Sequence, residues 1–240
     1  MRPIGPMAGK LFRDVVLEAV FPRFCVSCQA EGGLLCLACD EGWNPERPRV
    51  LEGKDEGVDG DIGKLWAMLP YANPVARELI TSWKYNYDSS AWAILRRRLA
   101  PQISTLMLTL AMYKIEAIVP LPLTKQRRCE RGFDQAVEIA EWLGKLTNLP
   151  VANLLVRKHT AGHQAERSVD ERLKAMKASP FSLDQRPRVL ALRGDPGCVY
   201  RRVLLVDDVW TTGATMSAGA RTLKSGGVEE VYGFTLARGK

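Results

Sequence analysis

The hydrophobic positions in the second half of the chain follow two different periods. Ile115–Leu123, Arg202–Val206 and Glu230–Arg238 are mostly apolar, and each of these segments predicts a buried strand. In Phe133–Leu146 the apolar residues instead recur every three or four positions, which predicts a helix, and a second helix is predicted at Met216–Lys224. Strands that alternate with helices indicate a parallel sheet with helices on its faces.

Local signals refine the bounds of these elements. Asp134 stands at the start of the first helix, where a carboxylate is well suited to capping it. Gly226 and Gly227 follow the second helix and favour its end there. A shorter apolar run at Val151–Leu155 predicts a further strand, with less support than the other three.

The composition divides the chain into three stretches. Residues 1–43 hold four of the six cysteines. Residues 44–63 are rich in proline, glycine and charge, which is typical of a linker. Residues 64–240 carry the alternating strands and helices, so we predict an α/β domain there.

Bulk composition narrows the class of protein. Hydrophobic residues make up 46% of the 240 residues, enough for a core, which argues against global disorder. The chain has 34 basic and 27 acidic residues and a net charge of +7. That excess suits an anionic ligand such as a phosphate ester, or a nucleic acid. No run of 18 apolar residues occurs, so we predict no membrane span.

The apolar segment Leu11–Phe21 does not have the pattern of a secretory signal. Arg13, Asp14 and Glu18 interrupt it, whereas a signal core is uncharged. The segment predicts a short amphipathic helix instead. We therefore expect a cytoplasmic protein, in which cysteines stay reduced and serve as metal ligands more often than as disulfides.

Four cysteines form two adjacent CxxC pairs with seven residues between the pairs. A CxxC turn brings two thiolates to one metal ion, and a short glycine-containing hairpin can bring two such turns together. This spacing predicts a structural zinc ribbon. A redox-active CxxC pair is the alternative, although that chemistry favours a single motif at the start of a helix. The predicted zinc ligands are Cys25, Cys28, Cys36 and Cys39.

The sequence VLLVDDVWTTGAT (Val203–Thr215) carries the most specific chemical signal. Asp207 and Asp208 are expected at the end of a strand, followed by the turn Thr211–Thr215 and a helix. The N–H groups of such a turn and of the helix N-terminus form a cradle for an anion, and Gly213 lets a ligand approach the backbone. Carboxylates accept hydrogen bonds from sugar hydroxyls, so the pattern suits a ribose 5-phosphate. An ordinary capped turn and a carboxylate metal site are the alternatives.

The full run DDxxTTGxT resembles the PRPP-binding signature of type I phosphoribosyltransferases. The resemblance implies a phosphoribosyltransferase-like parallel sheet flanked by helices. It also implies that the signature binds PRPP together with Mg²⁺, which would neutralise the leaving pyrophosphate. The residues of the signature are Asp207, Asp208, Thr211, Thr212, Gly213, Ala214 and Thr215.

Three further segments and the paired CxxC motifs resemble the ComF family, in the family's order and over most of the chain. They are LITSWKYNYDSSAWAIL, VPLPLTKQRRCERGFDQAVEIA and LVRKHTAGHQAERSVDERLKAMKASPF. ComF-family proteins, with the bacterial protein GntX among them, are tied to DNA uptake and use during competence and carry a phosphoribosyltransferase-like domain. Three positions depart from the family pattern, namely Asp134 in place of Asn, Arg167 in place of Leu and Ala175 in place of Asn.

The resemblance implies roles for several polar residues outside the signature. The basic loop TKQRRCERG would clamp the pyrophosphate through Lys125, Arg127, Arg128 and Arg131, with Lys84 of the Lys-Tyr block also in the PRPP site. Each of these could equally be a solvated basic residue. A mobile loop that closes over the site would hold Arg157, Gln164 and Arg172. The expected catalytic residues are Asp207, Asp208 and Arg131.

Two functions are compatible with these features. The first is a phosphoribosyltransferase whose acceptor the sequence does not name. The second is a non-catalytic protein that keeps the fold and binds single-stranded DNA or senses PRPP, with DNA-uptake proteins as further partners. Residues Trp83–Arg98 mix aromatic and basic side chains, as single-strand binders do. The tryptophans recur near helical spacing, however, which favours packing inside the protein.

Overall fold

A computed structural model describes residues 22–53, 58, 60–86, 88–158, 179–184 and 200–239. The described chain falls into two compact units. Unit 1 comprises Met1–Pro45 and Asn73–Arg98, and unit 2 comprises Glu46–Ala72 and Leu99–Lys240. The predicted helix at Leu11–Phe21 lies outside the described residues.

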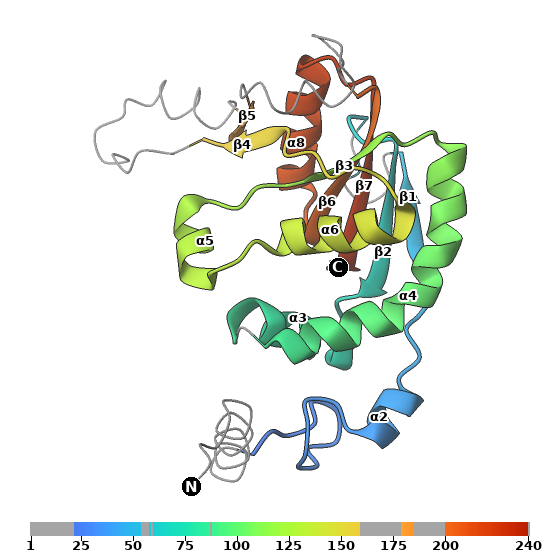
Figure 1. The fold of residues 1–240 in the computed structure, drawn as a ribbon, viewed down its shortest axis with the longest axis vertical. Helices are drawn as coiled ribbons and strands as arrows, with labels where there is room; N and C mark the ends of the chain where they lie inside the picture. The colour runs from blue at the N-terminus through green and yellow to red at the C-terminus, as the bar shows by residue number, and fades with distance from the viewer. Residues whose placement is uncertain are drawn as a thin grey trace, which may run out of the picture. The chain divides into compact units, whose positions relative to one another are not determined.

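Helices and strands alternate along most of the described chain (Figure 1). No described helix combines the length and the apolar character that a membrane crossing requires. The elements are α2 (Leu37–Gly42), β1 (Arg49–Glu52), β2 (Lys64–Pro70), α3 (Pro74–Tyr85), α4 (Ser89–Met112), β3 (Ala117–Pro120), α5 (Lys125–Arg131), α6 (Gln135–Thr147), β4 (Leu155–Arg157), β5 (Phe181–Leu183), β6 (Arg202–Trp210), α8 (Ala214–Ser225) and β7 (Glu230–Arg238).

Unit 2 is built on a five-stranded sheet in the order β1-β2-β7-β6-β3. β2, β7, β6 and β3 are parallel, and β1 pairs antiparallel with β2 at one edge. The four consecutive residues Val203–Val206 of β6 are all buried, so both faces of this strand are covered. The prediction of an α/β fold with a parallel sheet is therefore confirmed.

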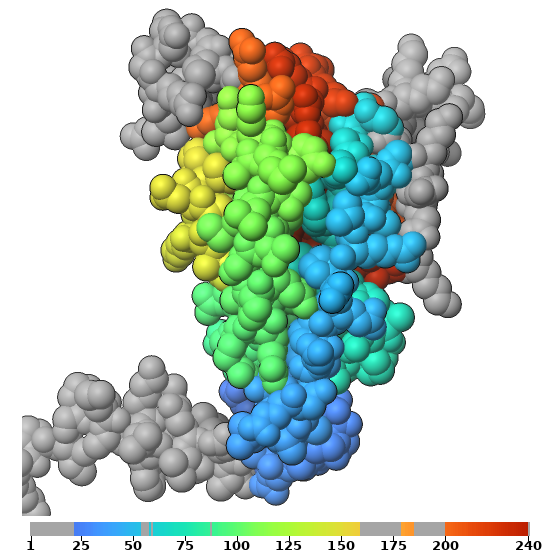
Figure 2. All heavy atoms as spheres, turned by 90° about the vertical axis from the view of Figure 1, so that its right-hand side faces the viewer, coloured from blue at the N-terminus to red at the C-terminus, as the bar shows by residue number. Residues whose placement is uncertain are grey.

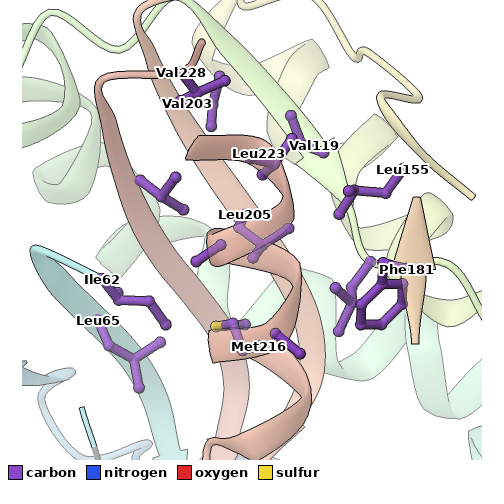
Figure 3. Close-up of a cluster of buried hydrophobic side chains, with 14 of the residues drawn as sticks. Ile62, Leu65, Val119, Leu155, Phe181, Val203, Leu205, Met216, Leu223 and Val228 are labelled. Carbon is purple, nitrogen blue, oxygen red and sulfur yellow. The ribbon is translucent and has the colours of Figure 1, made fainter. Parts of the chain in front are cut away.

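Helix α8 packs closely on one face of the sheet because two glycines leave room for it. A Cβ atom at Gly219 would lie 2.6 Å from a methyl group of Leu121, and one at Gly233 would lie 2.6 Å from a methyl group of Leu65. Met216 and Leu223 of α8 belong to the same hydrophobic cluster as Leu205 of β6 and Leu65 of β2 (Figure 3). This packing fixes the position of the turn before α8.

Residues 44–63, whose composition predicts a linker, contain a strand and buried residues. Arg49–Glu52 forms β1, and Leu51, Val58 and Ile62 are buried in the core of unit 2. Only Leu51 of the four β1 residues is buried, and Arg49 and Glu52 are charged, so this edge strand lacks a clear apolar run. Figure 2 shows the β1–β2 hairpin beside α4, and a pocket of about 500 Å³ lies between the hairpin and the unit 2 part of that helix.

Several predicted bounds agree closely with the structure. The last strand runs through Glu230–Arg238 as expected, and Asp134 caps α6 by accepting a hydrogen bond from the N–H of Ala136 at 3.2 Å. The expected strand Val151–Leu155 differs. Val151 makes an isolated bridge to Ile118, and Leu155 begins β4, which pairs with β5 in a separate two-stranded sheet.

The tryptophans of unit 1 pack inside it. Trp83 and Trp92 stack with ring centroids 4.5 Å apart and are both buried. Arg96 lies over the Trp92 ring at 5.6 Å. Packing therefore accounts for these two aromatic rings, as their helical spacing indicated.

Candidate functional site

Asp207 and Asp208 lie inside β6, which continues to Trp210 rather than ending at the acidic pair. Successive residues of a strand point to opposite faces of the sheet, so the two carboxylates leave β6 on opposite sides. Asp207 pairs in register with Thr235 of β7. Its Oδ1 accepts a hydrogen bond from the N–H of Asp208 at 2.8 Å. The two acids therefore have different surroundings, and the role of both in ligand binding stays a prediction.

The turn after β6 has the backbone conformation that an anion cradle needs. Gly213 adopts φ 76°, a left-handed conformation that favours glycine, and α8 begins at the next residue. No side chain from the described part of the chain caps α8, so its first N–H groups face the turn uncapped. Thr211, Thr212 and Thr215 are exposed around it. The turn can accept a phosphate without rearranging a cap.

A small cavity lies between the turn and the sheet. Its volume is about 20 Å³, room for about one water molecule, and Asp207, Thr215 and Thr235 are among its lining residues. Thr235 Oγ1 is fully buried and has no hydrogen-bond partner within the described residues. Thr235 was not among the predicted site residues, although it places a hydroxyl in a strand of otherwise mostly apolar residues.

The basic segment TKQRRCERG is helical. Thr124 caps α5 by accepting a hydrogen bond from the N–H of Arg127 at 3.2 Å, and Gly132 ends the helix with φ 66°. A loop was predicted for this segment from the sequence. Arg127 is exposed, whereas Arg131 donates to Oε1 of the buried Gln135 at 3.0 Å. The contact with Gln135 restricts the position of the Arg131 guanidinium.

Arg157 lies within electrostatic reach of both the basic helix and the acidic strand. Its guanidinium packs over the Phe181 ring at 5.2 Å. Burial lowers the pKa of Arg157, the charge of Arg127 lowers it further, and the carboxylate of Asp207 opposes both effects. The charges of Arg127 and Asp207 therefore both act on Arg157, although the three residues come from separate segments of the chain.

Asp134 has a structural environment. Besides capping α6, its Oδ2 accepts a hydrogen bond from the N–H of Leu123 at 3.3 Å. Burial raises the pKa of Asp134, while backbone N–H groups and the charge of Arg128 oppose the rise. Its carboxylate holds the start of α6 against the end of the β3 segment, which agrees with the capping role inferred from the sequence.

The remaining predicted site residues lie elsewhere or are not described. Lys84 is buried in α3 of unit 1, and its role in ligand binding stays a prediction. Gln164 and Arg172 lie outside the described residues.

The four predicted zinc ligands lie together in unit 1. Their sulfur atoms are all within 4.8 Å of one another, and those of Cys28 and Cys36 are 3.6 Å apart. A tetrahedral zinc site with Zn–S bonds of about 2.3 Å requires sulfurs separated by about 3.8 Å, so this cluster fits the ion. Burial raises the pKa of the Cys25 thiol, but N–H groups of the Cys28, Cys36 and Ser27 backbone outweigh it and lower the pKa to about 6. A thiolate there is ready to bind a cation.

Asp40 joins the cysteine cluster to helix α4. It follows Cys39 directly and is buried. Its two oxygens accept hydrogen bonds from Arg97 Nη2 at 2.7 Å and from Arg98 Nε at 2.8 Å. Burial favours the neutral acid, but the two guanidinium groups prevail and hold the pKa of Asp40 below its usual value. The cysteine cluster and helix α4 are therefore connected through one carboxylate.

Comparisons with known proteins agree with the resemblance seen in the sequence. No family model matches the chain. The chain is 34% identical over 125 residues to competence protein F of Haemophilus influenzae, covering 51% of this chain and 50% of the relative. It is 32% identical over 122 residues to competence protein ComFC of Bacillus subtilis, covering 50% and 44%. Against ComFC of Streptococcus pneumoniae the identity is 28% over 167 residues, covering 69% and 64%.

These relatives confirm the similarity to ComF-family proteins. The chain spans about half the length of the first two curated relatives that it matches. Among solved structures, a purine phosphoribosyltransferase from Pyrococcus horikoshii aligns with 59% of this chain and 82% of its own, at 18% identity and a TM-score of 0.31.

Proposed function

We propose that this chain is a ComF-like protein that binds PRPP, or another ribose 5-phosphate ligand, at the Thr211–Thr215 turn. The observation that carries the proposal is a small cavity that Asp207 lines together with Thr211, Gly213 and Thr215 of the turn before the uncapped helix α8. An acid for sugar hydroxyls, an uncapped helix N-terminus and two arginines are the groups that a phosphorylated ribose needs.

Each group would have a separate task in the bound state. The N–H groups of the turn and of α8 would bind the 5-phosphate, since they carry the positive end of the helix dipole. Asp207 would accept hydrogen bonds from ribose hydroxyls. Arg127 and Arg131 would bind the pyrophosphate, and Gln135 would hold Arg131 in place. Asp208, on the other face of the strand, would act on its neighbours rather than on the same hydroxyls.

The corresponding reaction is transfer of the phosphoribosyl group. The bond between C1 and the pyrophosphate oxygen breaks, a bond from C1 to the acceptor nucleophile forms, and pyrophosphate leaves with the electron pair. Mg²⁺ takes oxygen ligands, so Asp207 and the pyrophosphate oxygens would hold it, and it would supply charge neutralisation. The arginines stabilise negative charge on the leaving group, and the fixed sugar hydroxyls keep C1 oriented.

The names of the relatives connect this activity with competence. A protein similar to them would serve DNA uptake or use, with single-stranded DNA and uptake proteins as its partners. A non-catalytic PRPP sensor is the second candidate, since the grouping at Asp207 would equally support binding without transfer. The two differ in one outcome, the release of pyrophosphate with a suitable acceptor.

Calorimetry with PRPP, with and without Mg²⁺, tests the binding step. Wild type should bind PRPP more tightly with Mg²⁺, and Asp207→Asn should weaken binding about tenfold or more, because its amide cannot accept hydrogen bonds as a carboxylate does. Asp61→Asn removes an acid paired with Arg221 at 3.2 Å away from the turn and is the matched control. Equal PRPP affinity in wild type and Asp207→Asn would refute the assignment.

A further inference from the structure

One row of residues crosses the sheet from the candidate site to the antiparallel edge. Asp207 of β6 pairs with Thr235 of β7, Thr235 pairs with Ala67 of β2, and Ala67 pairs with Arg49 of β1. Residues that pair directly across strands point to the same face. Asp207 and Arg49 therefore lie on one face, separated by three strand spacings, about 14 Å.

The residues between the two ends of this row are small. Thr235 and Ala67 separate Asp207 from Arg49, and Ala237 with Leu69 forms the next row toward the carboxyl ends of the strands. Thr235 and Ala67 are buried, so they separate Arg49 from Asp207 rather than opening a path between them. A second pocket, of about 230 Å³, occurs where this face meets β1, and Ala67, Leu69 and Arg49 line it.

The charged residues that line this pocket are mainly basic. Three arginines contribute to it, Arg47 and Arg49 from the β1 segment and Arg238 from the end of β7, against the single acidic residue Glu46. Burial lowers the pKa of Arg238, and the nearby charge of Arg49 lowers it further. Guanidinium groups that repel one another at one site are stabilised when an oxyanion binds between them, and their planar forks match phosphate oxygens.

We propose that Arg47, Arg49 and Arg238 form a second phosphate-binding site at the β1 edge of the sheet. Ligand pockets for drug-sized molecules measure about 300 to 1,000 Å³, so this smaller pocket suits a single phosphate group with the rest of its molecule outside. This phosphate site does not depend on the proposed binding of PRPP.

Titration with inorganic phosphate, followed by calorimetry, tests the site directly. Wild type should bind one phosphate more than Arg49→Gln/Arg238→Gln, or bind it at least about tenfold more tightly, because the variant loses two charge-assisted contacts. Arg201→Gln changes the same charge at an exposed arginine that faces Glu229 at 3.6 Å, and it should match wild type. Arg49→Lys/Arg238→Lys keeps the positive charges but loses the planar guanidinium groups. Its affinity for phosphate should lie between those of wild type and Arg49→Gln/Arg238→Gln.

Ribose 5-phosphate distinguishes this site from the turn. At concentrations that fill only the tighter site, its affinity in Arg49→Gln/Arg238→Gln should stay within about twofold of wild type, with thermal unfolding confirming that the variant is folded. Phosphate binding that depends on the arginines, without any binding of ribose 5-phosphate, would sink the proposed function and leave this site standing. Equal phosphate binding in wild type and a folded Arg49→Gln/Arg238→Gln would overturn the second site.

Discussion

The cysteine cluster of unit 1 and the candidate ribose site of unit 2 are assembled in opposite ways. The cluster draws all four ligands from residues 25–39, so local turns suffice to bring the sulfurs within 4.8 Å. The proposed ribose site would take Arg127, Arg157 and Asp207 from three segments that lie far apart in the sequence. The geometry of the first site would depend on a metal, and that of the second would depend on the packing of a hydrophobic core.

Removing a zinc ligand should have the largest effect. Cys28→Ser takes away one thiolate, and a structural zinc site contributes about 10 to 16 kcal/mol of apparent binding free energy in small modules. We expect loss of bound zinc and unfolding of residues 22–45, measured by metal analysis and hydrogen exchange. Cys129→Ser, at an exposed cysteine of α5, should keep about one zinc per chain. A zinc-free wild type with protected amides in residues 22–45 would contradict the zinc ribbon.

A larger side chain between α8 and the sheet should destabilise the hydrophobic core that positions the candidate ribose site. Gly219→Val places a side chain where a Cβ alone would lie 2.6 Å from Leu121, so we expect destabilisation by about 1–3 kcal/mol in urea unfolding. The displaced turn should also weaken PRPP binding. Gly60→Ala, where nothing lies within 4 Å of the added Cβ, is the control. Unchanged stability in Gly219→Val would show that the interface between α8 and the sheet is loosely packed.

Asp40 connects the cysteine cluster to α4, and its stabilising effect should depend on pH. Because its pKa is lowered in the folded state, the contribution is present above the ordinary aspartate pKa of about 3.9 and is lost as pH falls through the folded value. Asp40→Asn should cost about 1–3 kcal/mol at pH 7 and flatten stability between about pH 5 and pH 2.

Urea unfolding at several pH values across that range measures the free energy of unfolding of wild type and Asp40→Asn. Glu41→Gln changes the exposed neighbour of Asp40 and should keep the wild-type pH dependence. If Asp40→Asn loses stability with falling pH as steeply as wild type does, the carboxylate is not the group that titrates.

Thr235→Val should have the smallest effect. The hydroxyl of Thr235 is buried and makes no hydrogen bond within the described residues, so an apolar replacement of similar shape removes little. We expect the free energy of unfolding to change by less than about 1 kcal/mol. A loss above 2 kcal/mol in urea unfolding would mean that a bound water satisfies the hydroxyl.

The contrast between the two regions also explains what the sequence could predict. The cysteine spacing, the Asp134 cap and the bounds of β7 are local features, and the structure matches each of them. β1 was not expected, because an edge strand with one buried residue in four reads as polar linker. Pairing between Arg49, Ala67 and Thr235 depends on strand order, which a single sequence does not specify.

The structure of a complex with ribose 5-phosphate would test the central claim most directly. The account predicts a phosphate within hydrogen-bonding distance of the backbone N–H groups of Gly213–Thr215, with ribose hydroxyls donating to Asp207. A ligand bound elsewhere, with the Thr211–Thr215 turn empty at saturating concentration, would contradict it.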